Sequence, residues 1–149
     1  MKRSLLVAAA LLLGVGAVVA QQDVIEQSHV LMKANGKSLG GTLSPMARGD
    51  KPYDQAAVDA ALTQLEDSAK KLPTLYPVSL KGAKLEGEYA PSAKIWDDKA
   101  GFDAQVAAFA KAVADAKAGI KDLDSLKANF PAIGKSCSGC HETYRVKNG

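Results

Sequence analysis

The chain has 149 residues, which allows one ordinary domain, and its formal net charge is +3. Removal of a predicted N-terminal leader takes Lys2 and Arg3 with it, so 17 basic residues remain against 16 acidic ones. This balance excludes the class of strongly basic nucleic-acid-binding proteins, because little net positive charge is left to follow a phosphate backbone. Alanine and lysine are abundant and β-branched residues are few, which favours helices. We therefore predict an all-α domain.

The first twenty residues have the layout of a secretory signal peptide. A short basic start is followed by an apolar run over residues 5–19. Val18 and Ala20 fit the −3 and −1 positions of a cleavage site, so we expect cleavage after Ala20. This divides the chain into a signal peptide (1–20) and a mature domain (21–149) exported to the periplasm. No second apolar segment approaches membrane-spanning length, so no membrane insertion is expected.

Two helices are predicted in the first half of the mature domain. The first covers residues 23–44 and carries apolar residues at helical spacing, and we expect Pro45 to end it. The second begins after Asp54, a good N-cap residue, and ends at Pro73. The loop between them contains the turn-forming residues 48–53.

Two further helices follow a long connection over residues 73–94 that is rich in proline, glycine, lysine and serine. The third helix is predicted over residues 97–118 and the fourth over residues 124–147, with a kink at Pro131. Four amphipathic helices, one pair joined by an extended crossover, predict a four-helix bundle.

The chemistry of the chain is concentrated in the fourth helix. Residues 137–141 read Cys-Ser-Gly-Cys-His, the C-x-x-C-H pattern of covalent haem attachment. Cys137 and Cys140 lie three positions apart on one helical face, so their thiols can add to the two vinyl groups of one porphyrin. His141 follows directly and can ligate the iron. We predict one haem c, attached through two thioether bonds.

Other interpretations of the two cysteines are less consistent with their setting. A Cys137–Cys140 disulfide is possible in an oxidising compartment. A thioredoxin-like pair requires a βαβ setting, which the sequence lacks. A zinc site requires four ligands, and His29 is the only other histidine.

The sequence resembles the class II cytochromes c, the cytochrome c′ family. The C-x-x-C-H pattern lies near the C-terminus and continues as Glu142-Thr143-Tyr144-Arg145, matching the family's C-x-x-C-H-x-x-[YF]-R ending. The likeness extends through residues 51–54, 72–77 and 95–97 and covers residues 21–149. It implies an antiparallel four-helix bundle with the haem packed inside.

The resemblance also implies a distal ligand. The low-spin branch of the family ligates the iron with a methionine of the first helix, and Met32 lies in that region on the inward stripe. Met46 lies beyond Pro45, about 21 Å further along a straight helix. His29 lies at the polar edge of the stripe and remains an alternative ligand. The alternative role for Met32 is that of a core methionine that only fills a gap.

Arg145 lies four positions after His141, one turn further along the predicted helix. The resemblance places this arginine close to the haem and its proximal histidine, where a positive charge disfavours the oxidised iron and can pair with a propionate. The alternative is an exposed arginine that interacts favourably with the helix C-terminus.

Two functions remain at this point. A His141/Met32-ligated iron predicts an electron carrier, because both axial positions are occupied. An open sixth position would instead give a protein that binds small gases such as NO or CO. No acid–base constellation accompanies the motif, so we do not expect an enzyme. Redox proteins are the expected partners, and a homodimer through the first two helices is possible in this family.

Overall fold

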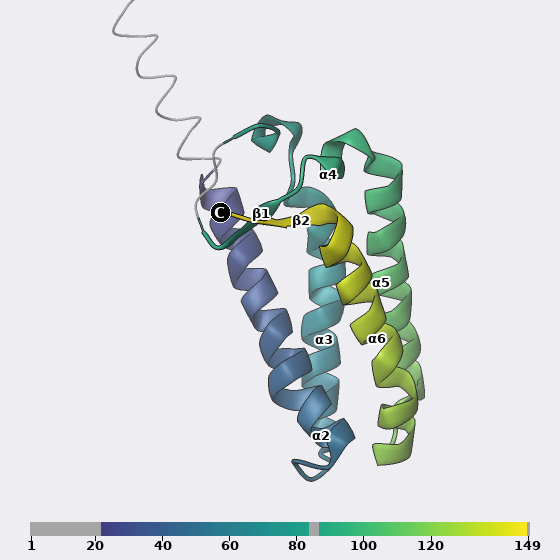
Figure 1. Ribbon diagram of the computed structural model, residues 1–149. Helices are drawn as coiled ribbons and strands as arrows, with labels where there is room; N and C mark the ends of the chain where they lie inside the picture. Colours follow the sequence, from purple (N-terminus) through teal and green to yellow (C-terminus); the bar gives the residue numbers. More distant parts are fainter. Residues whose placement is uncertain (1–21, 84–86, 149) are drawn as a thin grey trace, which may run out of the picture.

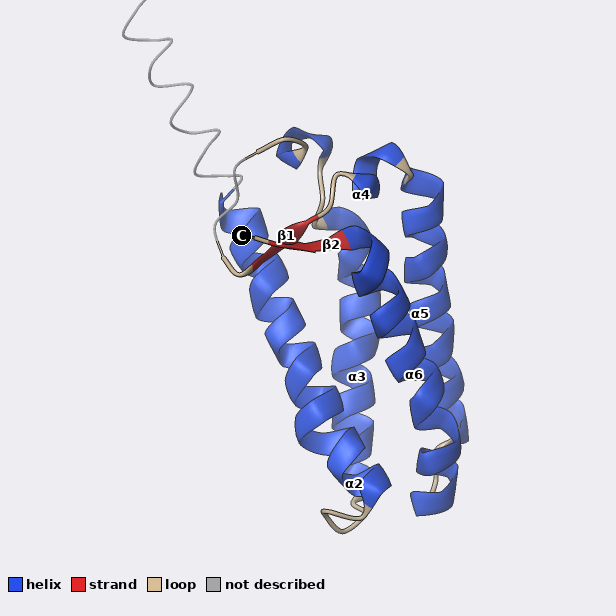
Figure 2. Cartoon of the chain, in the orientation of Figure 1, coloured by secondary structure: helices blue, strands red, loops and turns tan. Residues whose placement is uncertain are grey.

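The computed structural model describes residues 22–83 and 87–148, and the predicted signal peptide lies outside them. Four long helices run side by side as a bundle, which confirms the all-α prediction (Figure 1). A small two-stranded sheet crosses one end of the bundle (Figure 2). None of the helices in the described ranges is long and apolar enough to cross a membrane.

The first helix does not end at Pro45, contrary to the prediction. It is α-helical over residues 22–36, continues as the π-helix η1 (Lys37–Leu43), and ends as α2 (Ser44–Arg48). In the π-helical register the Ser44 N–H donates to the Leu39 carbonyl, five residues back. Pro45 thereby falls in the first turn of a new α-helical segment, where its missing N–H is not needed.

The carbonyl that faces Pro45 is satisfied by another residue. In a regular α-helix the Gly41 carbonyl would accept from residue 45, which has no N–H in proline. Here the Gly41 carbonyl accepts from Lys51 Nζ at 2.9 Å. The helix ends at Gly49, which has a φ of 84° and so adopts the left-handed conformation that glycine tolerates best.

The second helix of the bundle begins and ends close to the predicted residues. In α3 (Gln55–Lys71), Asp54 is the N-cap and accepts from the Ala56 and Ala57 N–H groups at 2.9 and 3.2 Å. The short 3₁₀-helix η2 (Leu72–Thr74) follows and contains Pro73. Where the sequence predicted the end of the helix, the α-helix therefore changes to a 3₁₀-helix, and the connection begins there.

The connection contains structure that the sequence did not predict. It forms the 3₁₀-helix η3 (Val78–Leu80), the strand β1 (Tyr89–Pro91) and the short helix α4 (Lys94–Asp97). Strand β1 pairs antiparallel with β2 (Arg145–Lys147), with Pro91 opposite Arg145. The predicted end of the fourth helix at residue 147 is therefore wrong. The helix stops at Tyr144, whose carbonyl accepts from the Ser92 N–H at 2.9 Å.

The last two bundle helices are α5 (Lys99–Gly119) and α6 (Leu123–Tyr144). Asp122 and Ser125 form a capping box that fixes the start of α6, and Pro131 lies inside this helix. Side chains from α3, α5 and α6 meet in an apolar core whose fully buried members include Leu62, Leu65, Val113, Leu126 and Ile133. This core holds α6 firmly against its neighbours, and α6 carries the C-x-x-C-H pattern.

Candidate haem site

A cavity of about 640 Å³ lies between the first helix, α5 and α6. This volume is within the range of roughly 300–1,000 Å³ that is usual for cofactor and ligand pockets. Met32 lines it from the first helix, Phe102 and Phe109 from α5, and Cys140 and His141 from α6. The cavity thus brings together residues separated by more than a hundred positions in the sequence.

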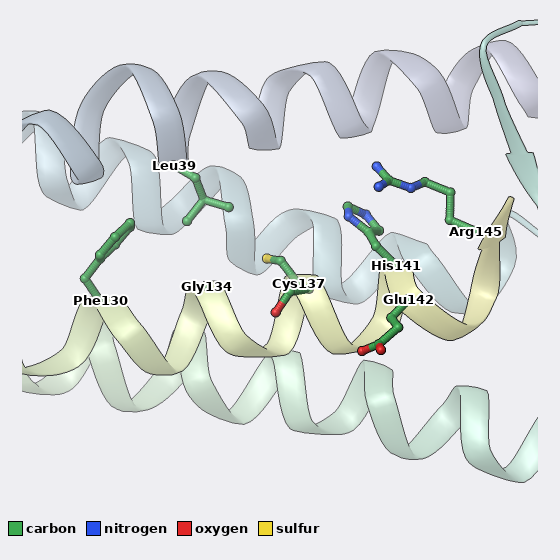
Figure 3. Close-up of a pocket in the computed structure, with 8 residues that line it drawn as sticks. Leu39, Phe130, Gly134, Cys137, His141, Glu142 and Arg145 are labelled. Carbon is green, nitrogen blue, oxygen red and sulfur yellow. The ribbon is translucent and has the colours of Figure 1, made fainter. Parts of the chain in front are cut away.

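A second hollow of about 570 Å³ adjoins α6 on a more open side. Leu39, Cys137, His141 and Arg145 line both spaces. In Figure 3 Cys137 and His141 project from α6 toward the first helix, whereas Glu142 points to the other side. A flat cofactor between these helices would therefore have one buried part and one part near solvent.

The two cysteines fit covalent attachment of such a cofactor. Cys137 and Cys140 are free thiols, both half-buried and both on the cavity side of α6. Burial raises the pKa of each thiol, and for Cys137 the neighbouring Cys140 raises it further. Both thiols are thus held protonated near neutral pH, and neither is in a disulfide.

His141 is held in the form that can ligate a metal. Burial lowers the pKa of the His141 imidazole, and the positive charge of Arg145 lowers it further. A lowered pKa favours the neutral ring, whose free nitrogen is the metal ligand. The imidazole, the two thiols and the apolar cavity together fit a covalently attached haem with an iron ligand on α6.

The structure places Met32 on the same cavity as His141, on the opposite helix. Met32 is half-buried, and Asn35 Nδ2 lies 4.0 Å from its sulfur atom. Met46 is buried in the core cluster, with 5% of its surface exposed, and does not line the cavity. Of the two methionines in the described residues, Met32 is therefore the one that faces the cofactor space.

His29 also reaches the cavity, but its ring has another partner. His29 Nε2 lies within 3.3 Å of the Tyr89 carbonyl oxygen of β1. This contact links the first helix to the small sheet at the edge of the cavity. One of the two ring nitrogens of His29 is thus within hydrogen-bond distance of a backbone carbonyl.

Arg145 does not continue the helix as the sequence analysis expected. It is the first residue of β2, and its guanidinium lies over the ring of Tyr89 with 4.3 Å between the guanidinium carbon and the ring centroid. Its side chain still lies beside His141 and lines the cavity (Figure 3). Arg145 thus lies close to His141, as expected. It does so as part of a paired strand and not as part of the helix.

Two polar pairs at the site were not predicted from the sequence. Ser28 Oγ and Tyr76 Oη are 2.9 Å apart, and both residues line the cavity. Ser68 Oγ donates to Asn35 Oδ1 at 2.6 Å. The available signal was the presence of Ser28 and Asn35 on the otherwise apolar stripe of the first helix. Their partners on other elements could not be identified from that stripe.

The comparisons with known proteins agree with this site. The family model for cytochrome c′ matches residues 23–145, and the chain belongs to that family, the class II cytochromes c. It is 51% identical to cytochrome c-556 of Rhodopseudomonas palustris over the full length of both chains. It is 43% identical to cytochrome c-555 of Bradyrhizobium diazoefficiens over 99% of each.

Solved structures give the same result. An NMR-validated structural model of oxidised cytochrome c556 from R. palustris superposes with a TM-score of 0.76 at 51% identity, covering 86% of this chain and 99% of that one. Cytochrome c′ from R. palustris also superposes with a TM-score of 0.76, at 38% identity, covering 85% of this chain and 98% of that one. The protein is thus a monohaem cytochrome with an antiparallel four-helix bundle and one covalently bound haem c.

Proposed function

We propose that this cytochrome is an electron carrier whose haem is attached through Cys137 and Cys140 and whose iron is ligated by His141 and Met32. The observation that carries the proposal is the position of Met32 and His141 on one cavity, on helices that face each other. When bound, the haem supplies an iron atom that alternates between the ferric and ferrous states. Occupation of both axial positions by side chains leaves no position for a substrate, which suits exchange of electrons with other redox proteins.

The surrounding residues support this function. Phe102 and Phe109 contribute apolar surface to the cavity, and apolar surroundings favour the ferrous state with its lower charge. The Arg145 guanidinium acts in the same direction, because a fixed positive charge near the iron disfavours its oxidation. We also propose that Arg145 can pair with a haem propionate.

A second function has support from the comparisons. A cytochrome c′ of R. palustris is 39% identical over 95% of this chain. A nitric oxide complex of a cytochrome c′ variant from Alcaligenes xylosoxidans superposes with a TM-score of 0.73 at 26% identity. If Met32 only packed above an open iron, this protein would bind gases too. The position of Met32 on the cavity, on the helix opposite His141, favours the electron carrier.

Carbon monoxide uptake separates the two functions and also tests His29. The reduced parent protein should bind CO slowly, because CO must first displace the Met32 sulfur from iron. A His29→Ala variant should bind CO at the parent's rate and keep the parent's optical spectrum, since its ring hydrogen-bonds to the Tyr89 carbonyl. Stopped-flow mixing measures both. Rapid uptake by the parent would instead establish the gas-binding function, and an iron opened by His29→Ala would establish bis-histidine ligation.

We propose that the protein works in the periplasm, after removal of residues 1–20. Mass spectrometry of the mature product should then find 129 residues beginning at Gln21, plus one haem that acid–organic extraction does not remove. The expression host must contain a haem-attachment system. A product of this length without haem would contradict attachment at residues 137–141, and a product that retains residues 1–20 would contradict export.

A further inference from the structure

The interface between the first helix and α3 contains a buried polar pair in otherwise apolar surroundings. Asn35 is 8% exposed and Ser68 is fully buried. Ser68 Oγ donates to Asn35 Oδ1 at 2.6 Å, and Gln64 Nε2 donates to the Ser68 oxygen at 3.2 Å. Such a pair has a large desolvation cost, so its geometry must be well satisfied to be tolerated.

The hydroxyl contacts of Ser68 orient the Asn35 amide. The single Ser68 hydroxyl proton has two acceptors within reach, Asn35 Oδ1 at 2.6 Å and the Gln64 carbonyl at 3.0 Å. With the proton on the shorter contact, the Asn35 NH₂ group points the other way. It points at Met32, where Nδ2 donates to the sulfur atom over 4.0 Å, one helical turn before Asn35. Asn35 also lines the haem cavity. The polar chain thus runs from α3, through Ser68 and Asn35, to the sulfur of the proposed iron ligand.

A thioether sulfur has two lone pairs, and iron ligation uses one of them. An amide donor on the other lone pair restricts rotation of the Met32 side chain and leaves the first lone pair available. The same hydrogen bond withdraws electron density from the sulfur, which makes it a weaker donor to ferric iron. A thioether is a weak acceptor, so this contact depends on the amide's being held in place by a stronger partner.

We propose that Asn35 is a positioning residue for Met32, and that Ser68 holds the Asn35 amide in the orientation in which it donates to the axial sulfur. This inference rests on the proposed ligation of the iron by Met32. It adds Ser68, which does not line the cavity, to the residues that determine the reduction potential. The potential is therefore set partly by the packing of α3 against the first helix.

The test uses the haem-loaded protein and three variants. Asn35→Leu removes the amide at similar volume, and Ser68→Ala removes the group that orients it. The matched control is Ser38→Ala, because Ser38 is also 8% exposed on the same helix but lies six positions from Met32. The measurements are the midpoint potential by spectroelectrochemistry and the thioether-to-iron charge-transfer band of the ferric protein.

Asn35→Leu should remain low-spin, with a lowered midpoint potential and a shifted charge-transfer band, because the sulfur becomes a stronger donor. Ser68→Ala should shift both quantities in the same direction by less, and Ser38→Ala should shift neither. If Asn35→Leu lowers only the stability, Asn35 is a structural bridge and the inference is wrong. If that variant does not fold, an unchanged potential in Ser68→Ala overturns the inference in the same way.

Failure of this inference can be distinguished from failure of the proposed function. A high-spin parent, or a Met32→Leu variant that stays six-coordinate, would contradict ligation by Met32 itself. A low-spin parent that Met32→Leu opens, combined with an Asn35→Leu variant of unchanged potential and band, would leave the electron carrier intact and reject only the role of Asn35.

Discussion

Replacement of Met32 by leucine should turn the proposed electron carrier into a gas-binding protein. Leucine fills a similar volume in the cavity but has no sulfur, so under the proposed ligation His141 would be the only axial ligand left. The iron should become five-coordinate and high-spin, and the midpoint potential should fall because thioether ligation favours the ferrous state. Carbon monoxide should bind at least about tenfold faster, equivalent to about 1.4 kcal/mol in the activation free energy.

Met46→Leu is the matched control for this result. It makes the same chemical change in the same helix, but at a methionine that lies in the core and does not line the cavity. Its spectrum and CO kinetics should equal those of the parent, with at most a small change in stability. Opening of the iron by Met46→Leu but not by Met32→Leu would show that the ligand has been assigned to the wrong residue.

Loss of the covalent attachment should have the largest effect on stability. In a Cys137→Ala, Cys140→Ala double variant freed of haem, the cavity of about 640 Å³ has no occupant. A cavity of that size should cost roughly several kcal/mol, because neighbouring helices can collapse into it only in part. A domain of this size is stable by about 5–15 kcal/mol in total, so the helices should loosen or unfold. Circular dichroism and urea denaturation measure the loss.

Ser138→Ala provides the control for the double variant, because Ser138 is exposed and lies between the two cysteines in α6. It should retain haem and the parent's free energy of unfolding. A haem-free double variant as stable as the haem-loaded parent would show that the bundle closes without its cofactor, and that the haem is not part of the core.

Local signals in the sequence predicted the features that depend on local chemistry. Asp54 caps α3 as predicted, because an N-cap interaction involves only neighbouring N–H groups. The C-x-x-C-H spacing is likewise local, and it predicted the cofactor that the comparisons support. These features require no knowledge of how distant segments pack.

The errors arose where contacts outside the predicted element determine the structure. Pro45 continues the first helix because a π-helical register precedes it and Lys51 satisfies the Gly41 carbonyl. Residues 145–147 form a strand because β1, more than fifty residues earlier, supplies the pairing groups. The Asn35–Ser68 hydrogen bond joins two helices across 33 positions. In each case the deciding partner could be identified only from the folded structure.

Ligation of the iron by both His141 and Met32 is tested most directly by an optical spectrum of the purified holoprotein in both oxidation states. The spectrum reports haem attachment, spin state and axial ligation in one experiment. We expect low-spin spectra in both states, with the thioether-to-iron charge-transfer band in the ferric protein. A high-spin ferric spectrum without that band, in a protein that binds carbon monoxide freely when reduced, would contradict this ligation and leave Met32 as a packing residue above an open iron.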